Sequence, residues 1–150
     1  MDYILNISPI DGRYARNTQE LNQYFSEYAF FKYRTKIEIE YFIFLHKLAI
    51  NDLKYLSIEQ INNIRLIYDN FLPETCLKIK EFEKITNHDV KSVEYYLKQE
   101  FENLKLEKYT QFIHFGLTSQ DINNTSITLM IKDSINDIIL PFLDTILHEL

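Results

Sequence analysis

Residues 118–150, TSQDINNTSITLMIKDSINDIILPFLDTILHEL, decide the fold class of this chain. The stretch contains no glycine, and Thr118 followed by Asp121 is a typical start signal of a helix. The pattern predicts one helix of roughly 32 residues, about 48 Å long, with a kink at Pro141. Apolar side chains recur every three or four residues, as on one face of an α-helix: Ile127, Ile131, Ile135, Ile138, Phe142, Ile146 and Leu150.

A helix of this length is long for a small globular domain, because the mean α-helix has about 12 residues. Its apolar stripe continues to Leu150 with neither a C-cap glycine nor a closing polar turn. The helices expected upstream are too short to cover it. We therefore expect the chain to be incomplete as a functional unit, or to dock its last helix in an assembly.

The rest of the sequence also favours helices over strands. The chain has only 2 glycines and 3 prolines, too few for a turn-rich β fold. Residues 1–16 are expected to form extended chain and turns, and residues 104–117 to be irregular. The predicted fold class is therefore all-α. Apolar periodicity and capping residues predict helices over 18–25, 27–49, 57–71, 73–86 and 87–103.

Two of these helices show a candidate face toward the core, and two show capping residues. Ser57 with Gln60 forms a capping box, and Asn87 is expected to be the N-cap of the helix over 87–103. The inward face of that helix is predicted to be Val90, Val93, Tyr96 and Leu97. In the helix over 27–49, one apolar face is predicted to carry Phe30, Ile37, Tyr41, Phe44 and Leu48.

The composition restricts the class of protein. Hydrophobic residues make up 46% of the chain, enough for a real core. The net charge of −6 argues against a nucleic-acid or anionic-membrane partner, because phosphates are bound by clustered Lys and Arg. The single cysteine, Cys76, excludes an intrachain disulfide. We find no signal peptide, and the strongest apolar run, residues 41–45, is too short to span a bilayer. We expect a soluble cytoplasmic protein.

The first of three polar clusters at breaks in the helical pattern is Ser8–Tyr14, SPIDGRY. In it a glycine turn is followed at once by Arg13. A guanidinium on a constrained loop suits bidentate binding of a phosphate or a carboxylate, and Tyr14 could add a hydroxyl. From the pattern alone, an ordinary surface turn with Arg13 in solvent is the favoured interpretation.

The second cluster is Asn87, His88 and Asp89 at a predicted helix start, where free N–H groups and the helix dipole attract anions. His88 could be a general acid or a charged donor, because an imidazole exchanges its proton near neutral pH. From the spacing alone, plain helix capping by Asn87, with His88 incidental, is the favoured interpretation. No second His, Cys or carboxylate stands at metal-ligand spacing, so the sequence predicts no metal site and no cofactor.

The third cluster begins at Gly116 and includes Thr118 and Ser119. Two hydroxyls at the start of a long helix could cradle a carboxylate, and the same residues could form a capping box, so both interpretations can hold together. His114 lies upstream among apolar neighbours. We expect it to be a half-buried histidine with a satisfied hydrogen bond and no catalytic role.

Taken in order, the three clusters resemble the N-terminal third of the bacterial adenylosuccinate lyases. The resemblance covers essentially the whole chain, and the first two motifs are the specific ones. The Thr-Ser-x-Asp motif is shared more widely in the fumarase and aspartase superfamily. The matching segments are Ser8–Tyr14, Phe25–Tyr28, Thr86–Tyr95, Phe112–Phe115, Thr118–Asn124 and Ile139–Pro141.

The resemblance implies a fold and a reaction. It implies a three-domain all-α subunit with a central bundle of very long helices, so residues 1–111 would be the N-terminal domain and 112–150 the beginning of the bundle. It implies a homotetramer with active sites shared between subunits. The reaction would be β-elimination of fumarate from adenylosuccinate, which gives AMP, and from the succinylated carboxamide precursor of purine synthesis.

The resemblance also implies roles for individual residues. Arg13 and Tyr14 match the nucleotide-contacting pair, with Arg13 at the phosphate. Asn87, His88 and Asp89 match a substrate-binding run, in which His88 orients the succinyl group or assists as an acid. Thr118 and Ser119 match the residues that hold a fumaryl carboxylate. The family's later histidine and its serine-bearing loop have no counterpart in residues 1–150, so the chain is expected to hold only part of a site and to be inactive alone.

Two alternatives remain open at the level of sequence. The chain could belong to another lyase of the superfamily, such as an argininosuccinate lyase or a carboxymuconate cycloisomerase, although the Ser8–Tyr14 and Asn87–Asp89 segments argue against this. It could also be a non-catalytic helical interaction module that keeps a lyase scaffold.

Overall fold

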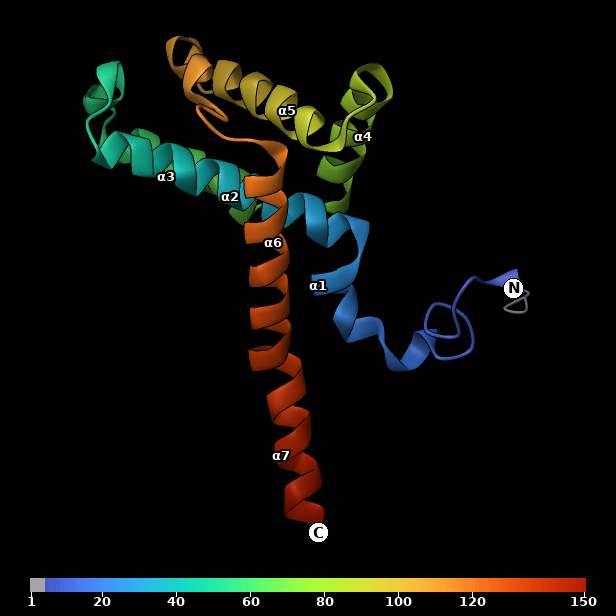
Figure 1. Ribbon diagram of the computed structural model, residues 1–150. Coiled ribbons are helices and arrows are strands. Elements are labelled where there is room, and N and C mark those ends of the chain that lie inside the picture. The colour runs from blue at the N-terminus through green and yellow to red at the C-terminus, as the bar shows by residue number, and fades with distance from the viewer. Residues whose placement is uncertain (1–4) are drawn as a thin grey trace.

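In the computed structural model, which describes residues 5–150, every regular element is a helix (Figure 1). This confirms the predicted all-α class. Within the same residues, no helix is both long and apolar enough to cross a membrane. Of the extended chain and turns expected over 1–16, the turns are present at residues 9–14, whereas residues 15–16 belong to a 3-10 helix. Residues 1–4 lie outside the described residues.

The segment before the first long helix contains less α-helix than predicted. Two short 3-10 helices, Ala15–Asn17 and Gln19–Leu21, lead into α1 (Asn22–Phe25), so the predicted helix over 18–25 is only partly α-helical. Ser26 then acts as N-cap of the next helix, because its hydroxyl accepts the N–H of Ala29 at 3.1 Å.

The second helix, α2 (Glu27–Lys47), is the centre of the fold and contacts α3, α4, α5 and α6. Because it is covered on several sides, one apolar stripe does not describe it. The predicted apolar face is not the buried one: Phe30, Ile37 and Tyr41 are half-buried, whereas Phe44 is 50% and Leu48 55% exposed. The buried face consists of Ala29, Phe31, Tyr33, Arg34, Thr35, Glu38, Ile39, Phe42, Ile43 and Leu45.

The next three helices lie close to their predicted bounds. α3 (Ile58–Asp69) opens with the predicted Ser57–Gln60 capping box, whose two hydrogen bonds are 2.9 and 3.1 Å long. α4 (Pro73–Thr86) has Pro73 in its first turn. α5 (Asp89–Asn103) packs against α4. Its predicted inward residues are all buried: Val90, Val93, Tyr96 and Leu97.

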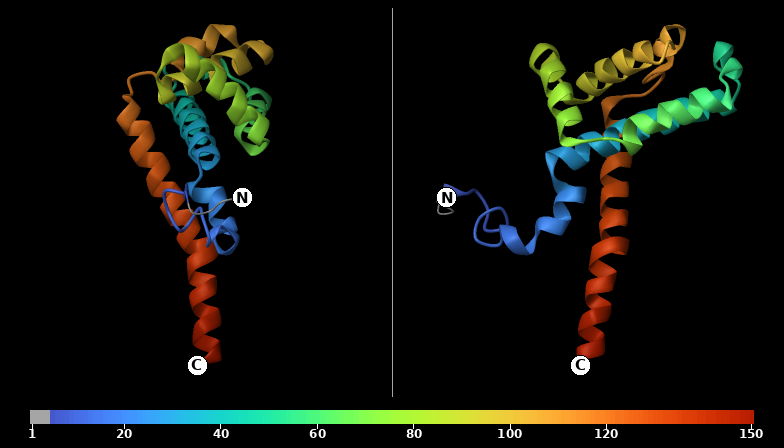
Figure 2. Two further views of the ribbon diagram at one scale, coloured as in Figure 1. Left: turned by 90° about the vertical axis from the view of Figure 1, so that its right-hand side faces the viewer. Right: turned by 180° about the vertical axis from the view of Figure 1, so that it is seen from behind.

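The C-terminal part forms the predicted long rod, which projects from the other helices in both views (Figures 1 and 2). It consists of α6 (Ser119–Ser134), a π-helical turn (Ile135–Ile139) and α7 (Leu140–Glu149). The irregularity lies one turn before Pro141, because a proline ring collides with the carbonyl four residues earlier and the wider π turn relieves that contact. Only the first part of the rod is covered, since α6 packs on α2.

Candidate functional site

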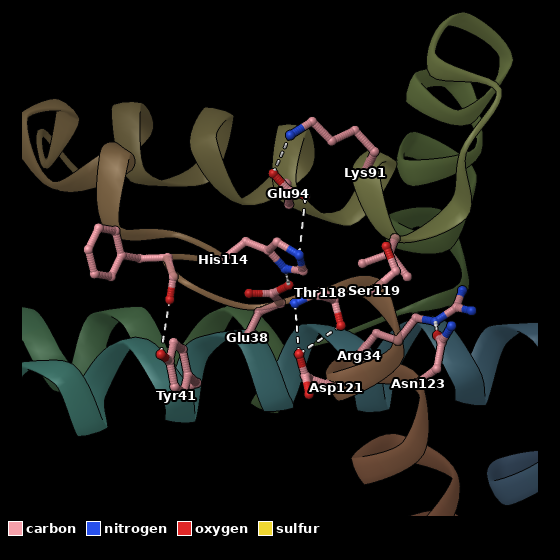
Figure 3. Close-up of polar contacts among 12 residues, drawn as sticks. Arg34, Glu38, Tyr41, Lys91, Glu94, His114, Thr118, Ser119, Asp121 and Asn123 are labelled. Carbon is pink, nitrogen blue, oxygen red and sulfur yellow. Dashed lines mark hydrogen bonds and ion pairs between the residues drawn. The ribbon is translucent and has the colours of Figure 1, made fainter.

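Two predicted clusters meet where α5 and α6 begin above α2 (Figure 3). Ser119 Oγ lies 3.5 Å from His88 Nε2, although 31 residues separate them in the chain. The side chain of His88 is 49% exposed, so the pair faces an accessible surface. The structure therefore brings together His88 and Ser119, which the sequence placed in separate motifs.

The helix start at α5 differs from the prediction in which residue is the cap. Asn87 has a left-handed backbone (φ 49°) and ends α4, where its N–H donates to the carbonyl of Glu83 at 2.8 Å. The predicted N-cap role of Asn87 is therefore wrong. His88 is the N-cap, because its Nδ1 accepts the N–H of Lys91 at 3.2 Å.

This cap determines which ring nitrogen of His88 faces the site. A nitrogen that accepts a hydrogen bond carries a lone pair, so the neutral ring has its proton on Nε2. Nε2 is also the atom that faces Ser119. The backbone of α5 thus presents the N–H of the imidazole, as a donor, toward the start of α6.

The helix start at α6 is fixed by Asp121. Its Oδ2 accepts the backbone N–H of Thr118 at 2.7 Å and the Thr118 hydroxyl at 2.8 Å. These two donors lower the pKa of Asp121. Because the Thr118 hydroxyl proton is committed to Asp121, the Ser119 hydroxyl and the free N–H groups of the first turn are the donors left for a ligand.

Asp89 is held from two sides. Its Oδ1 accepts the N–H of Val90 at 2.8 Å, and its Oδ2 forms an ion pair with Arg34 of α2. Burial alone would raise the pKa of Asp89, but the Val90 N–H and the Arg34 charge outweigh it and lower the pKa. Asp89 is therefore an anion whose negative charge is largely compensated by Arg34 and the Val90 N–H.

A second charged network lies beside this pair, around His114. Its Nδ1 is 2.5 Å from Oε1 of Glu38, and its Nε2 is 3.9 Å from Oε1 of Glu94. Lys91 donates to the other oxygen of Glu94 at 2.7 Å. The Glu38 carboxylate raises the pKa of His114 above its ordinary value. The prediction of a half-buried, satisfied His114 is confirmed, and both its partners are buried.

The loop before α6 needs special backbone geometry. His114 and Gly116 both have positive φ, 59° and 72°. Glycine adopts this region freely, whereas a histidine does so at a cost that its surroundings must offset. The offsetting contacts are the His114–Glu38 pair and the Tyr41 hydroxyl, which donates to the carbonyl of Phe115 at 2.9 Å. These contacts anchor the loop that delivers Ser119.

Arg13 and Tyr14 lie apart from this site. The segment that carries them runs away from the junction of α4, α5 and α6 (Figures 1 and 2). Arg13 Nη2 donates to the Tyr14 hydroxyl at 2.7 Å, and the guanidinium carbon lies 4.6 Å from the ring centroid. The two residues form a pre-assembled cation with a hydroxyl, and the structure does not bring them to His88 and Ser119.

Comparison with known proteins identifies the family. The family described as Lyase matches residues 12–150, which is most of the chain. This chain belongs to the lyase family. Its similar relatives include an adenylosuccinate lyase of Dictyostelium discoideum, 50% identical over 141 residues, which are 90% of this chain and 30% of the relative.

Two bacterial relatives also match this lyase chain over most of its length. The adenylosuccinate lyase of Legionella pneumophila (strain Corby) is 47% identical over 149 residues, which are 96% of this chain and 32% of the relative. That of Escherichia coli (strain K12) is 39% identical over 141 residues, 91% of this chain and 30% of the relative. The chain thus spans roughly a third of the length of these relatives.

Sequence reasoning missed three charged residues that shape the site of this lyase chain: Arg34, Glu38 and Glu94. All three are buried, with exposed fractions of 3%, 1% and 6%. Arg34 and Glu38 alternate with the charged residues Lys32, Lys36 and Glu40 along α2, so the sequence around them does not mark these two as buried. Their burial follows from the helices that pack on α2, which no local pattern predicts.

Proposed function

We propose that the protein to which this lyase chain belongs is an adenylosuccinate lyase. It would eliminate fumarate from adenylosuccinate, giving AMP, and from the succinylated carboxamide ribotide of purine synthesis. The observation that carries the proposal is the meeting of His88 and Ser119, at 3.5 Å, at two helix starts that suit an anionic substrate. The relatives that carry this name support the choice of substrate.

The proposed elimination requires hydrogen-bond donors at a carboxylate of the substrate. A base removes a proton from the carbon beside a carboxylate, and the negative charge that develops there must be held by aimed donors. In the proposal, Ser119 supplies its hydroxyl and a helix-start N–H to that carboxylate. Thr118, at the same carboxylate, orients the turn, because its N–H and its hydroxyl both donate to Asp121.

His88 would act at the succinyl end through Nε2, as an orienting donor or an assisting acid. Asn87 and Asp89 would flank it as substrate-binding residues. Asp89 also supplies negative charge next to the imidazole, since Oδ1 lies 3.6 Å from His88 Nδ1. An acid and a base that complete proton transfer would come from the remaining length of the protein.

Arg13 and Tyr14 would bind the nucleotide phosphate. Their segment lies away from His88, which fits a site assembled from several subunits. We propose a homotetramer in which this loop serves a shared active site, with the exposed stripe of α6 and α7 in a central bundle. In the same proposal, residues 1–111 form the N-terminal domain, 112–150 begin the bundle, and the enzyme works in the cytoplasm.

A substrate panel on the full-length protein tests this function. We expect the protein to release fumarate from adenylosuccinate and from the succinylated carboxamide ribotide. The release is monitored by the absorbance of fumarate. Argininosuccinate and a carboxymuconate should give no reaction. Activity on either of the latter alone would assign the chain to another lyase, and no activity on any of the four would favour a non-catalytic helical module.

A further inference from the structure

One buried cation connects the two helix starts that carry the site. Arg34 lies on α2 (Figure 3). Its side chain is 4% exposed. Its Nε donates to Oδ1 of Asn123 at 2.9 Å, and its Nη2 donates to Oδ2 of Asp89. Asn123 belongs to α6 and Asp89 to α5, so a single guanidinium joins both helices to α2.

The geometry of these two bonds depends on the guanidinium group. Nε–H and one Nη2–H point from the same edge of a rigid planar fork, so the two acceptors are held at a fixed spacing. The plane itself is held by Phe30, whose ring centroid lies 3.6 Å from Cζ. A lysine could keep the charge but could not direct two donors from one plane.

The acceptors stand next to the site residues. Asp89 follows His88 directly in the chain. Asn123 lies four residues after Ser119, which places both on the same face of α6, one turn apart. Any change in the spacing of Asp89 and Asn123 is therefore passed to His88 and Ser119.

We propose that Arg34 is a positioning residue that sets the separation of His88 and Ser119. The functional part of this inference rests on the proposed lyase activity, whereas the geometric part does not. The neighbouring Glu38–His114 pair joins α2 to the loop over 113–117, and Arg34 joins α2 to the helices themselves. Arg34 touches neither reacting atom, so its effect on turnover would be indirect.

The test compares Arg34→Lys with the wild type in the full-length protein, by crystal structure and by kinetics. We expect the distance from His88 Nε2 to Ser119 Oγ to increase by about 1 Å, and kcat for adenylosuccinate to fall by a factor of about 10–10². KM should change less, because the phosphate contact of the nucleotide is elsewhere. A merely structural role would lower the melting temperature and leave the distance and kcat of the folded enzyme unchanged.

Arg65→Lys is the matched control. Arg65 forms a two-bonded pair with Glu40, at 2.7 and 3.0 Å, between α3 and α2 and without contact to the site. The Arg65→Lys variant also replaces a guanidinium with an ammonium group. We expect this variant to leave the His88–Ser119 distance and kcat unchanged. An equal effect of both variants would overturn the proposal.

Asn123→Ala gives an answer if Arg34→Lys does not fold. It removes only the α6 half of the connection and keeps a good helix former at a half-buried position. An unchanged His88–Ser119 distance in the folded variants overturns the inference, whether or not the enzyme is active. Absence of fumarate release by the wild type would instead refute the proposed function, and the distance would still decide the role of Arg34.

Discussion

His114 Nδ1 and Glu38 Oε1 lie 2.5 Å apart, although 76 residues separate them in the chain. Glu38 is buried, and its second oxygen, Oε2, has no hydrogen-bond partner among residues 5–150. Burial raises the pKa of Glu38, although His114 opposes this effect. The pair fixes the loop before α6 onto α2, and it makes that attachment depend on the protonation of the imidazole.

The stability of the protein should therefore fall as the pH rises through the pKa of His114. Glu38 raises that pKa in the folded state above about 6.5, the value of a free histidine. The contribution is complete below the unfolded pKa and is lost above the folded one. Urea unfolding of the full-length protein between pH 6 and 9 measures it, with His114→Gln as the control that should flatten the dependence. Identical pH profiles for both proteins would contradict this assignment.

Arg13→Ala in the full-length enzyme should weaken nucleotide binding more than turnover. A charged contact to a phosphate far from the breaking bond is about equally strong in the ground and transition states, so its loss mainly raises KM. Such hydrogen bonds contribute about 1.5–3 kcal/mol, which corresponds to an increase in KM of roughly 10–150-fold. Steady-state kinetics with adenylosuccinate measures both constants. A large fall in kcat at constant KM would show that Arg13 does not bind the phosphate.

The polypeptide of residues 1–150 should associate in solution, because the rod of α6 and α7 presents a row of exposed apolar side chains. Ile131, Phe142 and Leu147 are 45, 65 and 69% exposed. Multi-angle light scattering should detect oligomers or aggregates, and glutamate at these three positions should reduce them. A sharp monomer peak with a cooperative melt of the unsubstituted polypeptide would refute this expectation.

The same polypeptide should release no fumarate from adenylosuccinate, since the proposed proton-transfer groups come from the rest of the protein. The assay is the one used for the full-length enzyme, at equal molar concentration. Turnover above the buffer rate would show that residues 1–150 hold a complete site.

The helix bounds were largely predictable, because their signals are local. Ser57 with Gln60 and the proline at position 73 mark helix starts in the sequence, and the structure confirms them. The buried face of α2 was not predictable in this way. Apolar periodicity describes a helix covered on one side, whereas α2 contacts five other α-helices, so charged and apolar residues are buried together.

The site could be predicted only in part. Its motifs were visible as breaks in the helical pattern, but the contact of His88 with Ser119 depends on how α5 and α6 are held. Arg34 supplies that connection from 55 and 89 residues away, and no local pattern encodes it. The sequence did not show that Asn87 is the C-cap of α4 and His88 the N-cap of α5, because asparagine suits both a helix N-cap and a left-handed C-cap.

In the proposed function, the imidazole of His88 acts on the substrate in addition to capping α5. His88→Asn separates these roles in the full-length enzyme, because an asparagine oxygen can replace Nδ1 as the acceptor for the Lys91 N–H but offers no imidazole toward Ser119. His88→Ala and Ser119→Ala complete the series, and loss of the cap alone would cost about 1 kcal/mol of stability.

The decisive measurement is kcat of His88→Asn together with its melting temperature. An interaction that strengthens in the transition state appears in kcat, and the loss of one such donor typically costs about 10²–10³-fold. We expect a fall in kcat on the order of 10² or more with a melting temperature equal to that of the wild type. A near-normal kcat would exclude His88 from the active site and leave helix capping as its role.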